Sequence, residues 1–205
     1  DVPKEKIVVV GGIQFKKGIQ GNCHLQHLTL RQAKASGVRG ESSFTMEDIL
    51  VEQCGYSGVF AVGTGVVGRC TNMEVRQCEW SGVYASNGAS ITLIGAKTTV
   101  HHNCTRGRSW IYGLQVYNSS STIQLVAPLT KEQVSIDNGG GGNWGAKHGG
   151  DINQINTIAA TTISSSSVPC GETKSNHASS TRRDDLLRLP DHVFTAKVVP
   201  FLGFK

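Results

Sequence analysis

The fold is decided by the stretch from Cys70 to Val126, which reads CTNMEVRQCEWSGVYASNGASITLIGAKTTVHHNCTRGRSWIYGLQVYNSSSTIQLV. Short runs follow one another in this stretch. In each run apolar side chains alternate with polar ones, which is the period of a strand with one buried face. A first cycle of three such runs begins at Met73, and a second begins at Thr98. A three-strand cycle that recurs along the chain indicates an internal repeat, which is typical of solenoid proteins.

A turn glycine marks the same place in each unit of the repeat. Four units carry it, with spacings of 21, 24 and 31 residues, at Gly37, Gly58, Gly82 and Gly113. A second recurring place lies four residues before the first three of these glycines, and we call it the ladder position. It is occupied in successive units by Ala33, Cys54, Cys78, Asn103 and, in a weaker fifth unit, Asn138. In a coiled stack, neighbouring ladder positions are about 4.8 Å apart.

Units of this length fit two architectures. The leucine-rich repeat pattern matches Leu25, Leu28 and Leu30, but it requires a convex side with further leucines after its conserved Asn or Cys. This chain instead continues through Ser-Gly-Val into a second alternating strand and then into a third. Three strands per unit favour an all-β fold, a right-handed parallel β-helix.

The sequence predicts three segments with different organisation. The β-helix is expected over residues 1–151, and its opening at residues 7–15 is typical of the final strands of a coil whose beginning is absent. Residues 152–181 are rich in Ser and Thr and predict a linker or a disordered segment. Residues 182–205 predict a tail with a short helix that caps the solenoid or binds a partner.

The composition agrees with an all-β protein that has many tight turns. Of its 205 residues, 38% are hydrophobic and 17% are charged, and glycine occurs 25 times against 5 prolines. The net charge of +5 is not gathered in a basic block, which argues against a nucleic-acid partner. No run approaches the roughly 20 apolar residues of a membrane span, so no membrane partner is predicted. No cofactor is predicted either.

Six cysteines suggest a disulfide framework, but their positions argue otherwise. Cys54 and Cys78 share the ladder position, where small buried side chains stack well, so we expect them to be buried and unbridged. The chain has no C-x-x-C pair. His101 and His102 are adjacent and would point to opposite faces of a strand, so no metal site is predicted.

Residues 5–150 resemble the right-handed β-helix repeat proteins of the pectin-lyase-like superfamily, in particular members from algae and their large viruses. The resemblance implies the fold and supplies no established reaction. The residues that carry it are Cys54-x-x-Ser57-Gly58-Val59, Cys78-x-x-Ser81-Gly82-Val83, Val100-His101-His102-Asn103, Tyr112-Gly113-Leu114, Ser119-Ser120-Ser121-Thr122-Ile123, Pro128-Leu129-Thr130-Lys131-Glu132 and Asp137-Asn138-Gly139-Gly140.

Catalysis on such a scaffold needs clustered acids on one face. The repeat instead aligns a column of alternating charge, which predicts a stabilising surface ladder and consists of Arg31, Glu52, Arg76 and His101. A polysaccharide lyase or uronate epimerase would require Glu47, Asp48 or Glu74 to meet Arg106 or Arg108 across coils. We therefore predict no catalytic residues and keep this enzyme class as an alternative.

The best candidate site is an insertion at residues 104–112, where six extra residues must leave the stack as a loop. Its cations and rings could hold an acidic sugar, with cation to carboxylate and ring to sugar face. The alternative is that Trp110 folds back over the stack and the arginines are only solvated. The predicted substrate-binding residues are Arg106, Arg108, Trp110, Tyr112 and, from the next turn, Trp144.

These observations favour a non-catalytic structural or binding protein that presents its β-helix surface to an acidic polysaccharide or a protein partner. A second alternative, beside the enzyme class above, is an assembly protein of a virion or cell surface. Such a protein would form oligomers end to end or through its tail.

Overall fold

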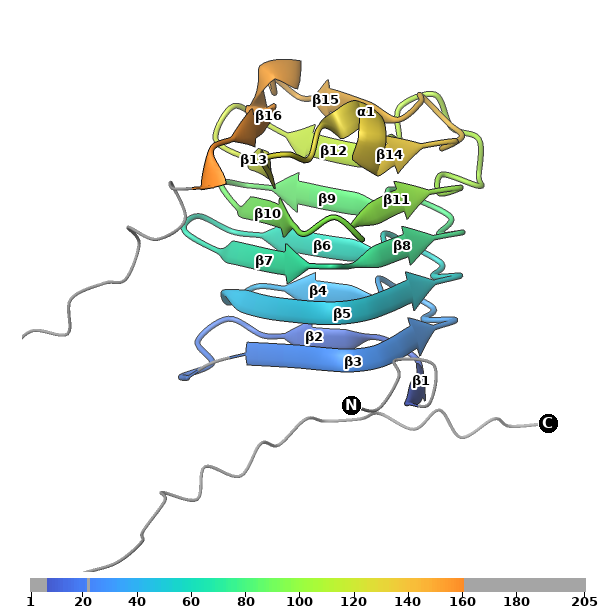
Figure 1. Cartoon of the computed structure of the whole chain (residues 1–205), viewed down its shortest axis with the longest axis vertical. Coiled ribbons are helices and arrows are strands. Elements are labelled where there is room, and N and C mark those ends of the chain that lie inside the picture. Colours follow the sequence, from blue (N-terminus) through green and yellow to red (C-terminus); the bar gives the residue numbers. More distant parts are fainter. Residues whose placement is uncertain (1–6, 22, 161–205) are drawn as a thin grey trace, which may run out of the picture. The chain divides into compact units, whose positions relative to one another are not determined.

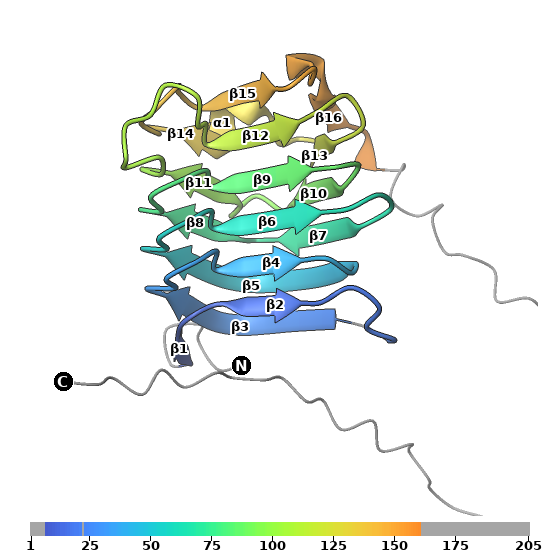
Figure 2. The ribbon, with the colours of Figure 1, turned by 180° about the vertical axis from the view of Figure 1, so that it is seen from behind.

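The strands of the computed structural model stack into a parallel β-solenoid that rises coil by coil along the chain (Figures 1 and 2). The structure describes residues 7–21 and 23–160. Most of the predicted linker, from residue 161, and the whole predicted tail therefore lie outside the described residues. The fold is the predicted parallel β-helix, and no helix among the described residues takes the place of a strand in a coil, as a leucine-rich repeat would require.

Two parallel sheets form the walls of the solenoid. The larger sheet has ten strands, which are β1 (Val8–Val10), β3 (Cys23–Arg31), β5 (Phe44–Glu52), β7 (Val67–Thr71), β8 (Glu74–Arg76), β10 (Ser90–Ile94), β11 (Thr99–His101), β13 (Thr122–Val126), β14 (Ser135–Ile136) and β16 (Ile155–Ile158). The smaller sheet has six strands, which are β2 (Ile13–Phe15), β4 (Val38–Gly40), β6 (Val59–Val62), β9 (Val83–Ser86), β12 (Leu114–Tyr117) and β15 (Trp144–Lys147).

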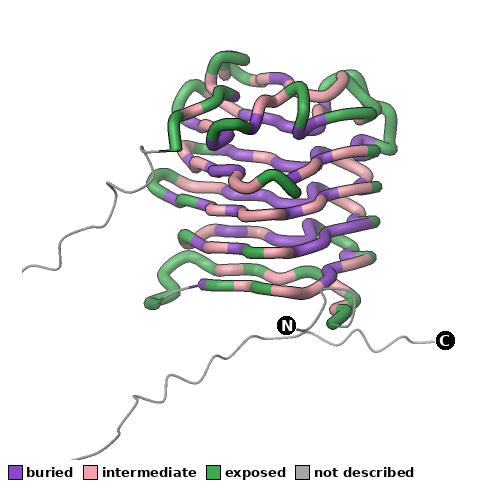
Figure 3. The backbone as a smooth tube through the Cα atoms, viewed as in Figure 1, coloured by how far each residue is buried: buried purple, intermediate pink, exposed green. Residues whose placement is uncertain are grey.

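Strand register places equivalent residues of successive coils directly above one another. Val51 pairs with Val75 and Val75 with Val100, and all three are fully buried. The inward-facing side chains of both sheets thus pack into one interior column. In Figure 3, buried and intermediate segments alternate along the coils, and exposed segments lie mostly at the loops and at the two ends. Stacking buries an apolar face that a single coil would leave exposed to water.

A left-handed residue turns the chain at one corner of five successive coils. It stands immediately before the ladder position, has a φ between 51° and 56°, and is Gln32, Gln53, Gln77, His102 or Asp137 in successive coils. The turn swings the chain from the larger sheet toward the smaller one and points the next side chain inward. This local geometry explains why the ladder position recurs.

The ladder cysteines behave as predicted. Cys54 and Cys78 are fully buried, and both thiols are free, as are those of Cys23, Cys70 and Cys104. Contact with the Cys54 thiol and burial together raise the pKa of the Cys78 thiol well above its ordinary value. Because the thiolate is the reactive form, Cys78 acts as a packing group rather than as a nucleophile. The hydrogen bond with Cys78 lowers the pKa of the Cys54 thiol, but this side chain is fully buried as well.

The ladder asparagines add hydrogen bonds to this column. Oδ1 of Asn103 accepts from the backbone N–H of Cys78 at 3.1 Å, and its Nδ2 donates to the carbonyl of Val75 at 3.0 Å. The same Nδ2 reaches Oδ1 of Asn138 at 3.1 Å, and Asn138 in turn bonds Asn143. Asn103 and Asn138 therefore form a ladder of side-chain amides, which ties their coils together through groups that would otherwise be buried without partners.

The repeat glycines lie where adjacent coils approach most closely. A Cβ added to Gly58 would lie 2.2 Å from Cγ1 of Val75 and 2.8 Å from the carbonyl oxygen of Gly82. At Gly82 it would meet Val100 at 2.3 Å and the amide of Asn103 at 2.8 Å. Only glycine fits at these positions, because a Cβ would collide with atoms of the next coil.

The C-terminal end of the described solenoid is closed by short helices. Helix α1 (Lys131–Val134) and the 3-10 helix η2 (Ile152–Gln154) lie over the last coils, and both begin with a capping box. Strand β16 pairs with β13, so the solenoid continues past the predicted boundary at residue 151. That boundary was placed too early, because the polar residues Asn156 and Thr157 hide the strand pattern.

Gly58→Ala tests whether successive coils approach so closely at the repeat glycines that no side chain fits there. We expect the free energy of unfolding to fall by about 2–3 kcal/mol or more, because the added methyl group overpacks a rigid contact. Gly65→Ala is the control, since nothing lies within 4 Å of its Cβ position, although its φ is +78°. That variant should lose only the 1–2 kcal/mol of a left-handed alanine. Equal losses in urea unfolding would contradict the steric account.

Candidate functional site

The predicted charge column exists and centres on one carboxylate. Glu52 pairs in register with Arg31 below and Arg76 above. Its Oε1 accepts from Nε of Arg31 at 2.9 Å, and its Oε2 accepts from Nη2 of Arg76 at 2.8 Å. The Glu52 side chain is only 3% exposed, whereas the two arginines are 42% and 36% exposed. The guanidinium groups therefore cover the carboxylate from both sides.

The two arginines determine the ionisation of Glu52. Burial alone would raise its pKa, but the hydrogen bonds and charges of Arg76 and Arg31 outweigh burial and lower the pKa below its ordinary value. The column continues through Glu74, whose Oε1 accepts from Nη1 of Arg76 at 2.9 Å and lies 3.4 Å from Nε2 of His101. This network is a structural clamp between coils, as the alternating charges predict.

The insertion at residues 104–112 leaves the stack between the ladder position and the turn glycine. Its first residues still follow the coil below, because the backbone N–H of Cys104 bonds Trp80 and that of Arg106 bonds Glu79. Ile111, which is 1% exposed, anchors its return. Residues 105–110 are exposed between these anchors, so the loop presents its side chains to solvent from a fixed base.

The two arginines of the loop differ in their partners. Nε of Arg106 donates to Oε2 of Glu79 at 2.5 Å, so its charge is neutralised locally. The guanidinium carbon of Arg108 lies 5.7 Å from the centroid of the Trp80 ring and 5.3 Å from that of Trp110. Arg108 has no carboxylate partner within residues 7–21 and 23–160, which leaves its charge uncompensated beside the two rings.

The remaining predicted site residues lie apart from this pair. The ring of Tyr112 covers Gly145, whose added Cβ would lie 2.5 Å from it. Trp144 pairs in register with the inward-facing Leu114 and packs against the core, with Nζ of Lys131 5.5 Å from its ring centroid. Arg106, Arg108 and Trp110 therefore share the exposed loop, whereas Tyr112 packs beside it and Trp144 faces the interior.

Sequence reasoning missed the aromatic rings beneath the loop. Tyr56 and Trp80 each stand two residues after a ladder cysteine, and their centroids lie 4.5 Å apart. Phe60 and Tyr84 stack beside them at 4.7 Å. Burial raises the pKa of Tyr84 to about 12. The repeat alignment alone would have found these rings, because each pair occupies one repeat position in successive coils.

Two acids of the alternative enzyme site, Asp48 and Glu74, have other partners. Oδ2 of Asp48 lies 3.2 Å from Nδ1 of His27, and Glu74 belongs to the Arg76 network. Across the described part of the chain, no group of three or more His, Cys, Asp or Glu side chains could hold a metal ion. No helix there is long and apolar enough to cross a membrane.

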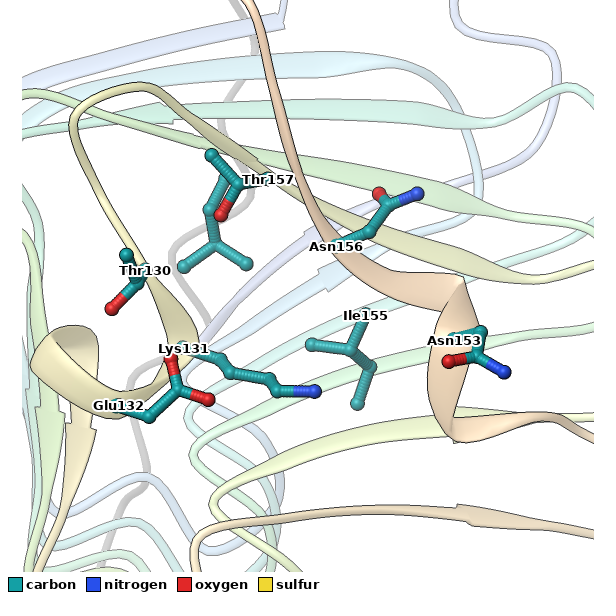
Figure 4. A pocket seen from close by; sticks show the side chains of 8 residues that line it. Thr130, Lys131, Glu132, Asn153, Ile155, Asn156 and Thr157 are labelled. Atoms are coloured by element: carbon teal, nitrogen blue, oxygen red, sulfur yellow. The ribbon is translucent and has the colours of Figure 1, made fainter.

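One shallow pocket lies at the C-terminal end of the described solenoid. It has a volume of about 270 Å³ and opens between α1 and β16. Figure 4 shows Lys131 and Glu132 on one side and Asn153 and Asn156 on the other. The pocket is separate from the loop, and its lining mixes single charges with amides and Ile155, without a group of like charges.

No protein-family model matches the chain, and neither a curated protein nor a solved structure is significantly similar to it. The parallel β-solenoid therefore stands on the structure alone.

Glu52→Gln tests the clamp through the pH dependence of stability. A lowered folded-state pKa adds stability above the unfolded value of about 4.3, and that stability is lost as the pH falls through the folded-state pKa. The wild type should lose stability on acidification below about pH 5. Glu52→Gln should be about 1–3 kcal/mol less stable at pH 7, because Arg31 and Arg76 lose their charge-assisted hydrogen bonds to Glu52 but remain partly exposed to water. Glu52→Gln should also lose less stability than the wild type when the pH is lowered.

The control for this measurement is Glu132→Gln, which removes an exposed carboxylate of α1. Its urea unfolding curves between pH 3 and pH 7 should follow those of the wild type. If Glu52→Gln lost as much stability on acidification as the wild type, Glu52 would not be the group whose pKa sets this pH dependence.

Proposed function

We propose that this protein is a non-catalytic β-solenoid of the pectin-lyase-like kind that binds an acidic polysaccharide through the loop at residues 104–112. The observation that carries the proposal is the Arg108 guanidinium, which lies over Trp80 and Trp110 and has no carboxylate partner within the described part of the chain.

A guanidinium held over aromatic rings suits the recognition of a carboxylate. The guanidinium of Arg108 lies near the faces of both rings, and its N–H groups are donors that a carboxylate can accept from in pairs. Because the two rings restrict the Arg108 side chain, less side-chain entropy is lost when a carboxylate binds. Trp110 is 44% exposed, so part of its indole remains available for the face of a sugar ring.

The engaged acids support a binding role over a lyase or epimerase. Glu52 is covered by two arginines, and Asp48 and Glu74 pair with His27 and Arg76. Arg106 pairs with Glu79 rather than with Glu47, Asp48 or Glu74. Asp48 and Glu74 therefore pair with groups other than the arginines of the loop.

Binding to polygalacturonate and alginate, measured by calorimetry, tests the proposal. Arg108→Ala should weaken binding about 10- to 100-fold, which corresponds to the loss of a charge-assisted contact. Trp110→Ala should also weaken it. Arg69→Ala is the matched control, because it removes an equal charge from β7 in the larger sheet.

Two outcomes would overturn this function. Absorbance of an unsaturated product that disappears in Arg106→Ala would identify a lyase. Absence of binding to any acidic polysaccharide would leave assembly with a protein partner as the better account.

A further inference from the structure

We propose that Glu79 is a specificity-determining residue that adapts the loop to polymers with isolated carboxylates. The inference rests on the proposed function of the loop. It specifies how the carboxylates are spaced along the polymer that the loop binds. It follows from the unequal pairing of Arg106 and Arg108.

The position of Glu79 is set by the backbone of the stack. Its N–H donates to the carbonyl of the ladder residue Cys54 at 2.8 Å, and its own carbonyl accepts from the N–H of Arg106 at 3.2 Å. The carboxylate of Glu79 therefore lies directly beneath the start of the loop. The side chains of Arg106 and Glu79 are 48% and 42% exposed, so the ion pair is formed at the surface, within reach of a ligand.

This arrangement leaves the loop with one uncompensated positive charge. Arg106 is neutralised by Glu79, whereas Arg108 lies over Trp80, the residue that follows Glu79. A ligand carboxylate can bind Arg108, but a second one near Arg106 meets the negative charge of Glu79. Charges closer than the Debye length of about 8 Å are not fully screened at physiological salt. The loop should therefore disfavour a polymer with a carboxylate on every sugar.

Glu79→Gln should change the preference of the loop in a defined way. We would compare polygalacturonate, which has a carboxylate on every residue, with hyaluronan, which has one on every second residue. The wild type should prefer hyaluronan. Because an exposed ion pair contributes only modestly, Glu79→Gln should bind polygalacturonate about threefold more tightly. Its affinity for hyaluronan should change less.

Two controls separate this effect from a general change of charge. Glu132→Gln raises the net charge equally, at α1, and should leave both affinities unchanged. The double variant Glu79→Gln/Arg106→Ala should not bind polygalacturonate more tightly than the wild type, because the tighter binding requires an Arg106 side chain that is no longer paired with Glu79. Thermal unfolding of each variant checks that the fold is retained.

The outcomes separate this inference from the function on which it rests. A wild type that binds neither polymer overturns the proposed function and the inference with it. A wild type that binds hyaluronan, together with a Glu79→Gln variant that gains no affinity for polygalacturonate, overturns the inference alone. A gain that persists in the double variant overturns it as well.

Discussion

The close approach of successive coils at one corner is the constraint on which this solenoid depends. At Gly58 there is no space for a Cβ beneath Val75, and at Gly82 there is none beneath Val100. The ladder residue at the same corner must then either form hydrogen bonds with the buried polar groups around it or pack closely enough to exclude water. Cys78 excludes water, whereas Asn103 supplies hydrogen bonds to both neighbouring coils. The strands on either side follow from this corner, because it sets their register.

The same corner explains where a binding loop can be built. A loop inserted between the ladder residue and the turn glycine leaves both contacts in place, as Asn103 and Gly113 show. The coil below still guides the first residues of the loop, and buried Ile111 guides the last. Arg108 and Trp110 thus protrude from a rigid base, which reduces the entropy lost when they contact a ligand.

Much of this architecture can be predicted from the sequence because it repeats. The three-strand cycle, the stacking of Cys54 over Cys78 and the column through Glu52 all follow from equivalent positions. The pairing of Arg106 with Glu79 does not, because the six extra residues of the loop have no counterpart in other coils. The inward position of Trp144 was missed for a related reason, since its register with Leu114 depends on the path of that loop.

The free energy of unfolding of Asn103→Ala tests most directly the claim that the corner holds the coils together. The variant leaves the Cys78 N–H and the Val75 carbonyl without their side-chain partner, and each such buried group costs about 1–3 kcal/mol. A loss of at least about 2 kcal/mol is predicted, against about 0.5 kcal/mol for Gln124→Ala on the outer face of β13. Equal losses would show that the strands, and not the ladder, determine the stability of the stack.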